Sequence, residues 1–261
     1  MAETKMNVTL IGHTQLSESF KRALGFEGLT HIKDGTDGQA IALSAIRTCY
    51  SANKPSEIVA KEGAKYFGTT ATDGEKGTEA DRLFRTIFRS KHTSTLEHLT
   101  FTFAVEGISR ALLAQLTRHR VGFSFSVQSQ RYVKFGSNDR SGGMDYVRPD
   151  SIDDDKWLRF DETKVDAISA IGLFYEAMDN AQRSYNMLRK AGVPAEDARA
   201  VLPNAAATNL VMTVNLRSLL DFYGKRRKGR GAQAEITELA EALRTEVTEV
   251  EPWTEQFFEA V

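Results

Sequence analysis

The segment Leu99–Glu106 constrains the fold of this chain more than any other, because its apolar and polar residues alternate strictly. This period of two is typical of a β-strand with one buried face. After Gly107 the apolar residues recur at helical spacing as far as Leu116, which predicts that the strand stops at the glycine and that a helix follows, ending near His119. A chain that changes its hydrophobic period in this way combines sheet and helix.

The same kinds of pattern predict most of the other elements. We expect strands at Val8–Ile11 and Leu210–Val214, an extended segment at Phe123–Val127, and helices at Ala40–Ile46, Ile58–Phe67, Thr78–Arg89, Leu216–Tyr223 and Ala232–Val250. A long amphipathic helix is expected over Glu162–Lys190, closed by a Gly-Val-Pro stop signal, and Asn215 is a candidate helix N-cap. No repeat or linker is visible. We therefore expect one α/β domain of the mixed α+β class over 1–261, with a central, mostly antiparallel sheet flanked by helices.

Composition excludes several classes of protein. The 261 residues carry 34 Lys and Arg against 35 Asp and Glu, and this balance excludes a polycation that wraps nucleic acid. The single cysteine, Cys49, excludes an internal disulfide and a zinc site with several thiolates. No apolar run approaches the roughly 18 residues of a membrane span, and the start lacks a signal-peptide core. We expect a cytoplasmic protein with no membrane, nucleic-acid or metal partner.

One long window carries basic residues but no acid. Between residues 107 and 138 the basic side chains are Arg110, Arg118, His119, Arg120, Arg131 and Lys134. The arginines alternate with apolar residues, and a guanidinium in apolar surroundings is costly unless an anion pairs with it. The window therefore predicts a site for an anionic small molecule. A second basic cluster, Lys225–Arg230, is typical of a mostly solvated face.

The centre of this window has a pattern suited to a nucleotide. Gln115 and Arg118 are three residues apart, so a helix would place them on one face. Ser129 and Arg131 alternate in what we expect to be an extended segment, which would point both side chains to the same side. Such forked donors and hydroxyls suit a phosphate and a ribose.

These residues also carry a resemblance to a family. Arg118-His119-Arg120, a short spacer, Ser129 and then Gln130-Arg131-Tyr132 resemble the signature of flavin-dependent thymidylate synthases. Three further blocks, in family order, are similar to family segments: His92-Thr93-Ser94-Thr95-Leu96-Glu97-His98, Ala198-Arg199-Ala200-Val201-Leu202-Pro203 and Thr213-Val214-Asn215-Leu216-Arg217-Ser218. The resemblance spans roughly Arg47 to Gln233.

The resemblance implies roles for individual residues. Flavin contacts would be Ser94, Arg118, His119 and Arg120 with His92 nearby, and Asn215 and Arg217 from another subunit. Contacts to deoxyuridylate would be Gln115, Arg118, Gln128, Ser129, Gln130, Arg131, Arg199 and Arg226, of which Arg226 is the catalytic residue. Two positions depart from the family. The Glu or Gln that many relatives have before the signature serine falls on Val127 or Gln128, and Asp221 stands near the flavin as either a contact or a structural partner of Arg217.

The implied activity is reductive methylation of dUMP to dTMP. The carbon would come from 5,10-methylenetetrahydrofolate and the electrons from NADPH through FAD, in a homotetramer with active sites between subunits and without an enzyme nucleophile. The main alternative is a single-stranded RNA-binding protein that uses the Arg/Phe-rich stretch 107–138 for phosphate and stacking contacts. A serine hydrolase is a weaker alternative, because the Gly-x-Ser-x-Gly elbow is missing.

Overall fold

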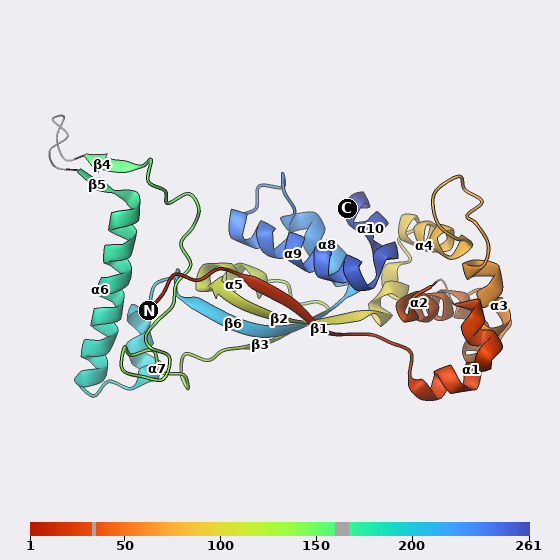
Figure 1. The fold of residues 1–261 in the computed structure, drawn as a ribbon, viewed down its shortest axis with the longest axis horizontal. Coiled ribbons are helices and arrows are strands. Elements are labelled where there is room, and N and C mark those ends of the chain that lie inside the picture. The colour runs from red at the N-terminus through yellow and green to blue at the C-terminus, as the bar shows by residue number, and fades with distance from the viewer. Residues whose placement is uncertain (33–34, 160–166) are drawn as a thin grey trace. The chain divides into compact units, whose positions relative to one another are not determined.

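The computed structural model describes residues 1–32, 35–159 and 167–261 (Figure 1). They group into two compact units, each built from several stretches of the chain. Unit 1 comprises residues 1–7, 104–118 and 125–211, and unit 2 comprises residues 8–103, 119–124 and 212–261. The expectation of a single domain over 1–261 stays a prediction.

A four-stranded sheet of order β1-β2-β6-β3 supplies part of each unit (Figure 1). Its strands are β1 Asn7–His13, β2 Thr100–Ser109, β3 Phe123–Val127 and β6 Ala207–Asn215. Thr102 bonds Thr213 (Oγ1 to Oγ1, 2.9 Å), and the Gly107 amide donates to the Asn209 side chain at 2.9 Å, so β2 and β6 run antiparallel. Hydrogen bonds at both ends of the β1–β2 pair and of the β3–β6 pair show that these outer strands also run antiparallel to their neighbours. The predicted mixed α/β class with a central antiparallel sheet is confirmed.

Gly107 does not end its strand, contrary to the prediction. β2 continues through it to Ser109, and Gly107 adopts a φ of +66°, which a glycine tolerates. A side chain there would bring a Cβ within 2.4 Å of the Lys5 carbonyl oxygen, so glycine allows a close backbone approach. Helix α5 (Arg110–Leu116) then starts after Ser109, whose hydroxyl accepts from the Leu112 amide at 2.9 Å, and it ends before the predicted His119.

Unit 1 contains the long helix α6 (Ala170–Lys190), which is shorter than the predicted Glu162–Lys190 (Figure 1). Residues 162–166 of that prediction lie outside the described residues. Residues 167–169 form strand β5 (Ala167–Ser169), which pairs antiparallel with β4 (Trp157–Arg159). The helix begins only at Ala170 because the Ser169 hydroxyl caps it, accepting from the Gly172 amide at 3.0 Å. Helix α7 (Ala195–Ala198) and a 3₁₀ turn (Arg199–Val201) follow.

Unit 2 holds most of the other helices (Figure 1). They are α1 Glu18–His31, α2 Asp37–Thr48, α3 Ile58–Phe67, α4 Glu79–Arg89, α8 Leu216–Arg226, α9 Ala234–Val250 and α10 Glu255–Ala260, with 3₁₀ turns at Pro55–Glu57, Thr93–His98 and Pro252–Thr254. The predicted helix Ile58–Phe67 is confirmed, and Asn215 caps α8 as predicted. Helices α8 and α9 pack against each other, and α8 extends beyond the predicted Tyr223 to Arg226. Among the described residues, no helix is both long and apolar enough to cross a membrane.

A buried carboxylate at the start of α4 makes the stability of unit 2 depend on pH. Glu79 is 6% exposed and accepts from the Arg82 guanidinium and the Thr72 amide, both at 2.7 Å. These bonds lower the pKa of Glu79 from 4.5 to about 2, and the bond from Arg82 has the largest effect. A lowered folded-state pKa stabilises the fold above the unfolded pKa, and this contribution is lost as the pH falls through the folded value.

We therefore expect thermal stability to decrease between about pH 4.5 and pH 2, and Glu79→Gln to make that decrease shallower. Calorimetric melting at a series of pH values measures the effect. Glu238→Gln, at an exposed position of α9, is the control. An unchanged slope for Glu79→Gln would contradict this assignment.

Candidate functional site

In unit 1 a cavity of about 520 Å³ combines two arginines that are distant in sequence. Arg110, the first residue of α5, and Arg199, in the 3₁₀ turn after α7, both line it together with Gln130. Burial, and secondarily the charge of Arg199, lower the pKa of Arg110, so both guanidiniums lie within electrostatic range of each other. Within the described parts of the chain, no carboxylate forms an ion pair with either arginine. Two half-buried cations without a described ion-pair partner make this cavity a candidate site for an anion, although Glu196 and Asp197 also line it.

One signature residue after β3, Gln130, lines the same cavity, and another, Arg131, bonds a lining residue. Gln130 is 7% exposed and lines it, as does Glu196. Arg131 donates through Nε to Glu196 at 3.0 Å, and both side chains are about half exposed, so a stronger anion would displace this weak pair. Arg199 donates through Nε to the Glu196 carbonyl at 2.9 Å, which orients its terminal nitrogens.

Two details of the predicted geometry are wrong here. Strand β3 ends at Val127, and residues 130–132 form a turn in place of the expected extended segment. The Ser129 hydroxyl accepts from the Arg131 amide at 3.2 Å, so the alternation argument does not apply to this pair. Helix α5 ends at Leu116, so Arg118 follows the helix and does not share its face with Gln115. Gln115 is half-buried and Arg118 exposed.

Gln128, one of the two candidates for the family Glu or Gln, is bonded to strand β6. The Gln128 backbone amide donates to Asn209 at 2.8 Å, which continues the pairing of β3 with β6. Its side-chain oxygen accepts from the Asn209 amide at 3.5 Å. The Gln128 side chain is therefore engaged by the neighbouring strand.

In unit 2 the fold brings Arg226 and His119 together from positions 107 residues apart. Arg226 is the last residue of α8, and both its Nε and Nη2 lie 3.3 Å from Nε2 of His119. Because a guanidinium only donates, this nitrogen of His119 is the acceptor and carries no proton. The buried ring of Phe222 contacts the His119 ring edge-on, with centroids 4.9 Å apart. This packing fixes the imidazole and, through it, the half-buried guanidinium.

Of the other predicted flavin contacts, Arg118 belongs to unit 1 and the rest lie in unit 2. Arg217 forms an ion pair with Glu97, and Ser94 and Arg120 are exposed. Nδ1 of His92 lies 3.1 Å from the Tyr50 hydroxyl. The suggested pairing of Asp221 with Arg217 is wrong: Asp221 accepts from Lys225 at 2.7 Å, one turn later on the exposed face of α8.

Asn215 and Gly122 show how the spacer loop within the signature meets α8. The Asn215 side chain accepts from the Ser218 amide at 2.9 Å, and its backbone amide donates to Gly122 at 3.2 Å. Gly122 has a φ of +72°, and a Cβ there would lie 2.1 Å from the Ser218 hydroxyl oxygen. Only glycine allows this contact, which holds the loop that carries His119 and Arg120 against the start of α8.

Several residues of these groups are not predicted by the sequence patterns. Arg110 lies in the acid-free window, which indicates a basic residue but does not by itself assign Arg110 to the site. Tyr50 and Phe222 gave no signal, because their role depends on contacts with His92 and His119.

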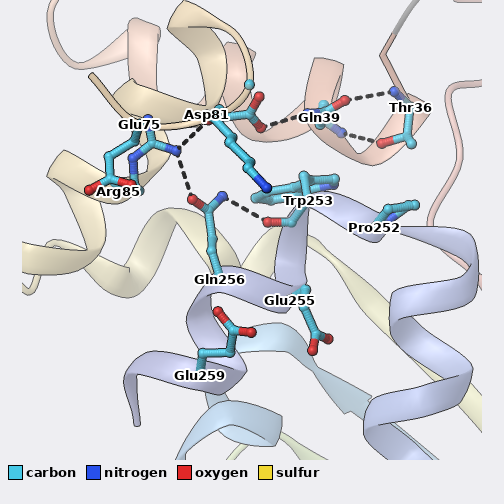
Figure 2. Close-up of a pocket in the computed structure, with 12 residues that line it drawn as sticks. Thr36, Gln39, Glu75, Asp81, Arg85, Pro252, Trp253, Glu255, Gln256 and Glu259 are labelled. Atoms are coloured by element: carbon cyan, nitrogen blue, oxygen red, sulfur yellow. Dashed lines mark hydrogen bonds between the residues drawn. The ribbon is translucent and has the colours of Figure 1, made fainter. Parts of the chain in front are cut away.

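Another cavity of about 660 Å³, shown in Figure 2, is less suited to a ligand. Its polar groups bond one another: Arg85 donates to Gln256 at 3.0 Å, Gln256 to the Trp253 carbonyl at 2.8 Å, and Gln39 to Asp81 at 3.2 Å (Figure 2). Across the described residues, no group of three or more His, Cys, Asp or Glu side chains is arranged to hold a metal ion.

Known proteins resemble this chain over most of its length. The family model described as "Thymidylate synthase complementing protein" matches residues 31–253. The flavin-dependent thymidylate synthase of Geobacter sulfurreducens is 38% identical over 204 residues, which are 78% of this chain and 75% of the relative. The flavin-dependent thymidylate synthase of Clostridium tetani is 34% identical over 230 residues, which are 82% of this chain and 79% of the relative.

A solved structure shares the fold. The UMP/dUMP methylase PolB from Streptomyces cacaoi, bound with 5-Br dUMP, superposes with a TM-score of 0.67 at 21% identity, over 99% of this chain and 96% of PolB. At this identity the likeness concerns the fold alone. On the family match and the identities of these relatives, the chain belongs to the flavin-dependent thymidylate synthases.

Proposed function

We propose that this chain methylates dUMP to dTMP, taking the carbon from 5,10-methylenetetrahydrofolate and two electrons from NADPH through FAD. The observation that carries the proposal is the cavity in which Arg110 and Arg199 lie without a described ion-pair partner. A nucleotide monophosphate is a dianion, and planar guanidiniums bind phosphate through paired hydrogen bonds. Gln130 lines this cavity and Arg131 bonds Glu196 at its edge, so these two residues, with the neighbouring Ser129, would add donors for the phosphate and the sugar.

The donor set fits a flavin dinucleotide. Arg118 and Arg120 are exposed, and no described residue forms an ion pair with either, so both are available to a pyrophosphate. The exposed hydroxyl of Ser94 and the side-chain amide of Asn215 suit a ribose or ring edge. Arg217 would exchange Glu97 for the dinucleotide, and His92, held by Tyr50, would lie nearby. Bound flavin supplies the hydride chemistry, which no side chain provides.

The protein's own contribution to the chemistry is charge and orientation. Uracil becomes a carbon nucleophile at C5 when negative charge develops on its N3–C4–O4 system. Arg226 is always protonated, so it cannot act as a base, but it stabilises this charge when its fork faces N3 and O2. His119 accepts from Arg226 and keeps the guanidinium from rotating. Because charge stabilisation activates the ring, no enzyme nucleophile is required.

We infer that the active form is a homotetramer with sites shared between subunits. Several large apolar side chains are strongly exposed in the isolated chain, among them Val121 at 86%, Tyr132 at 80% and Met187 at 59%. Val121 directly follows Arg120, so an interface there would lie next to the signature. Light scattering of the purified protein measures the mass; a monomeric enzyme with full activity would contradict this inference.

A simple experiment tests the proposed reaction. Purified protein should be yellow, and the flavin-loaded enzyme should form dTMP from dUMP only when methylenetetrahydrofolate and NADPH are both present. Protein that stays colourless after incubation with FAD, or that forms no dTMP, would reject the proposal. The RNA-binding alternative is disfavoured because the chain belongs to an enzyme family, and because two rings of the stretch are engaged: Phe123 packs against Phe222 and Phe135 is buried.

Cys49→Ser should retain substantial activity. Cys49 is exposed, its Sγ lies 3.8 Å from the Ala45 carbonyl oxygen, and the proposed chemistry needs no thiolate. The measurement is the rate of dTMP formation per bound flavin. Complete loss of turnover in a folded, yellow Cys49→Ser protein would indicate a covalent thiolate mechanism.

A further inference from the structure

The cavity of Arg110 and Arg199 in unit 1 carries negative charge as well as positive. Glu196 and Asp197, which are neighbours in α7, line it beside the two arginines. Both acidic residues are exposed, whereas both arginines are half-buried, so the carboxylates lie nearer to solvent than the guanidiniums. Carboxylates in a cavity that binds a phosphate weaken the binding of every anion. Their presence therefore requires a physical explanation.

Glu196 stays at the cavity after a phosphate has bound. In the free chain its carboxylate accepts from Nε of Arg131 at 3.0 Å, and the two side chains are 46% and 54% exposed. Such an exposed ion pair contributes little stability, so a phosphate dianion would replace Glu196 on Arg131. The Glu196 backbone remains fixed, because its carbonyl accepts from Nε of Arg199 at 2.9 Å. Binding of one phosphate therefore leaves an unpaired carboxylate close to it.

Asp197 adds a second negative charge to the lining. Its side chain forms no ion pair with any residue that the structure describes, and its backbone amide donates to the Pro194 carbonyl at 3.1 Å. Among the described lining residues, Arg110 and Arg199 are the cations, and their two charges match one phosphate dianion. A second phosphate on the same ligand would meet carboxylates and no further cation. Like charges brought together in this way disfavour the wrong ligand.

We propose that Glu196 and Asp197 select the substrate by its number of phosphates, so that the cavity accepts a nucleoside monophosphate and rejects the di- and triphosphate. The inference deepens the proposed function and rests on it. Di- and triphosphates of the same nucleoside share the base and the sugar with the monophosphate, so contacts to base or sugar do not reject them. Arginines attract all three ligands, and rejection of the longer ones needs a repulsive element. The two carboxylates supply it.

Removal of the two charges tests this selection. Equilibrium dialysis with the flavin-loaded full chain, in buffer with EDTA and no divalent cation, measures the binding of dUMP and dUDP. We expect dUDP to bind the unaltered chain about 10²-fold more weakly than dUMP. In the double variant Glu196→Gln with Asp197→Asn, dUDP should bind about tenfold more tightly, whereas dUMP should gain at most about threefold from the release of Arg131. Weaker dUMP binding by this variant would overturn the proposal, since the carboxylates would then be contacts to the sugar.

The salt dependence of the unaltered chain gives a second measurement that needs no variant. Both carboxylates are exposed, so added salt should screen the repulsion and bring the affinities for dUDP and dUMP closer together. A ratio of affinities that changes neither with salt nor in the double variant would show that the shape of the cavity excludes the longer ligand, and would overturn the proposal.

The control is Glu176→Gln, an exposed carboxylate of α6 outside the cavity, which should keep the ratio of the unaltered chain. Equal binding of dUDP and dUMP by the unaltered chain, or binding of neither, would also overturn the selection. Failure of the proposed function would appear differently, as an unaltered chain that binds dUMP in preference to dUDP but forms no dTMP.

Discussion

Arg226→Ala should lower turnover by about 10²–10³-fold while the protein stays folded and yellow. Arg226 ends α8, and its guanidinium is held by His119 Nε2 at 3.3 Å, so it is positioned before substrate binds. A preorganised donor aimed at developing charge contributes far more than one that must first be ordered. Lysine should rescue only part of the rate, because a point charge does not reproduce a planar fork. Single-turnover oxidation of reduced flavin with dUMP and methylenetetrahydrofolate measures the effect.

The choice of control for Arg226 depends on the structure. The basic cluster 225–230 was expected to be mostly solvated, and Lys228 and Arg230 are indeed exposed. Arg227 is not: it is half-buried, and its Nε is buried without a hydrogen-bond partner among the described residues. Lys228→Ala is therefore the clean control and should turn over normally. Normal turnover by Arg226→Ala would show that the uracil-activating arginine lies elsewhere.

Arg199→Ala should weaken dUMP binding by about 2–5 kcal/mol and leave flavin content nearly unchanged. Arg199 shares its cavity with Arg110, where burial already lowers the pKa of the neighbouring guanidinium, so a bound phosphate would be partly desolvated. Charge pairs in such surroundings are stronger than those at a solvated rim. Arg110→Ala should have a similar effect, although Arg110 lies outside the family signature.

Equilibrium dialysis with labelled dUMP measures both variants, and binding should weaken as the salt concentration rises. Arg183→Ala, at an exposed position of α6, is the matched control and should bind dUMP normally. If Arg199→Ala loses flavin but keeps dUMP, the division of the basic residues between the two ligands is wrong.

The local elements of this chain are determined by its sequence. The alternation before Gly107 predicts β2, the spacing of apolar residues predicts α3, and Asn215 predicts the start of α8. These predictions succeed because period and capping depend on neighbours within a few residues. The family follows from ordered motifs for the same reason, since a motif is also a local pattern.

Only the tertiary structure decided which distant groups meet. Gly107 stays within its strand, where its amide bonds Asn209 and its lack of a side chain leaves room for the Lys5 carbonyl, and Arg217 pairs with Glu97 in preference to Asp221 one turn away. Arg110 joins Arg199, and Arg226 joins His119, across separations that no local pattern encodes. Such pairings follow from how helices pack on the sheet and from which charges that packing buries. The residue types of the site were therefore readable from the sequence, whereas the partners that orient them depend on the packed fold.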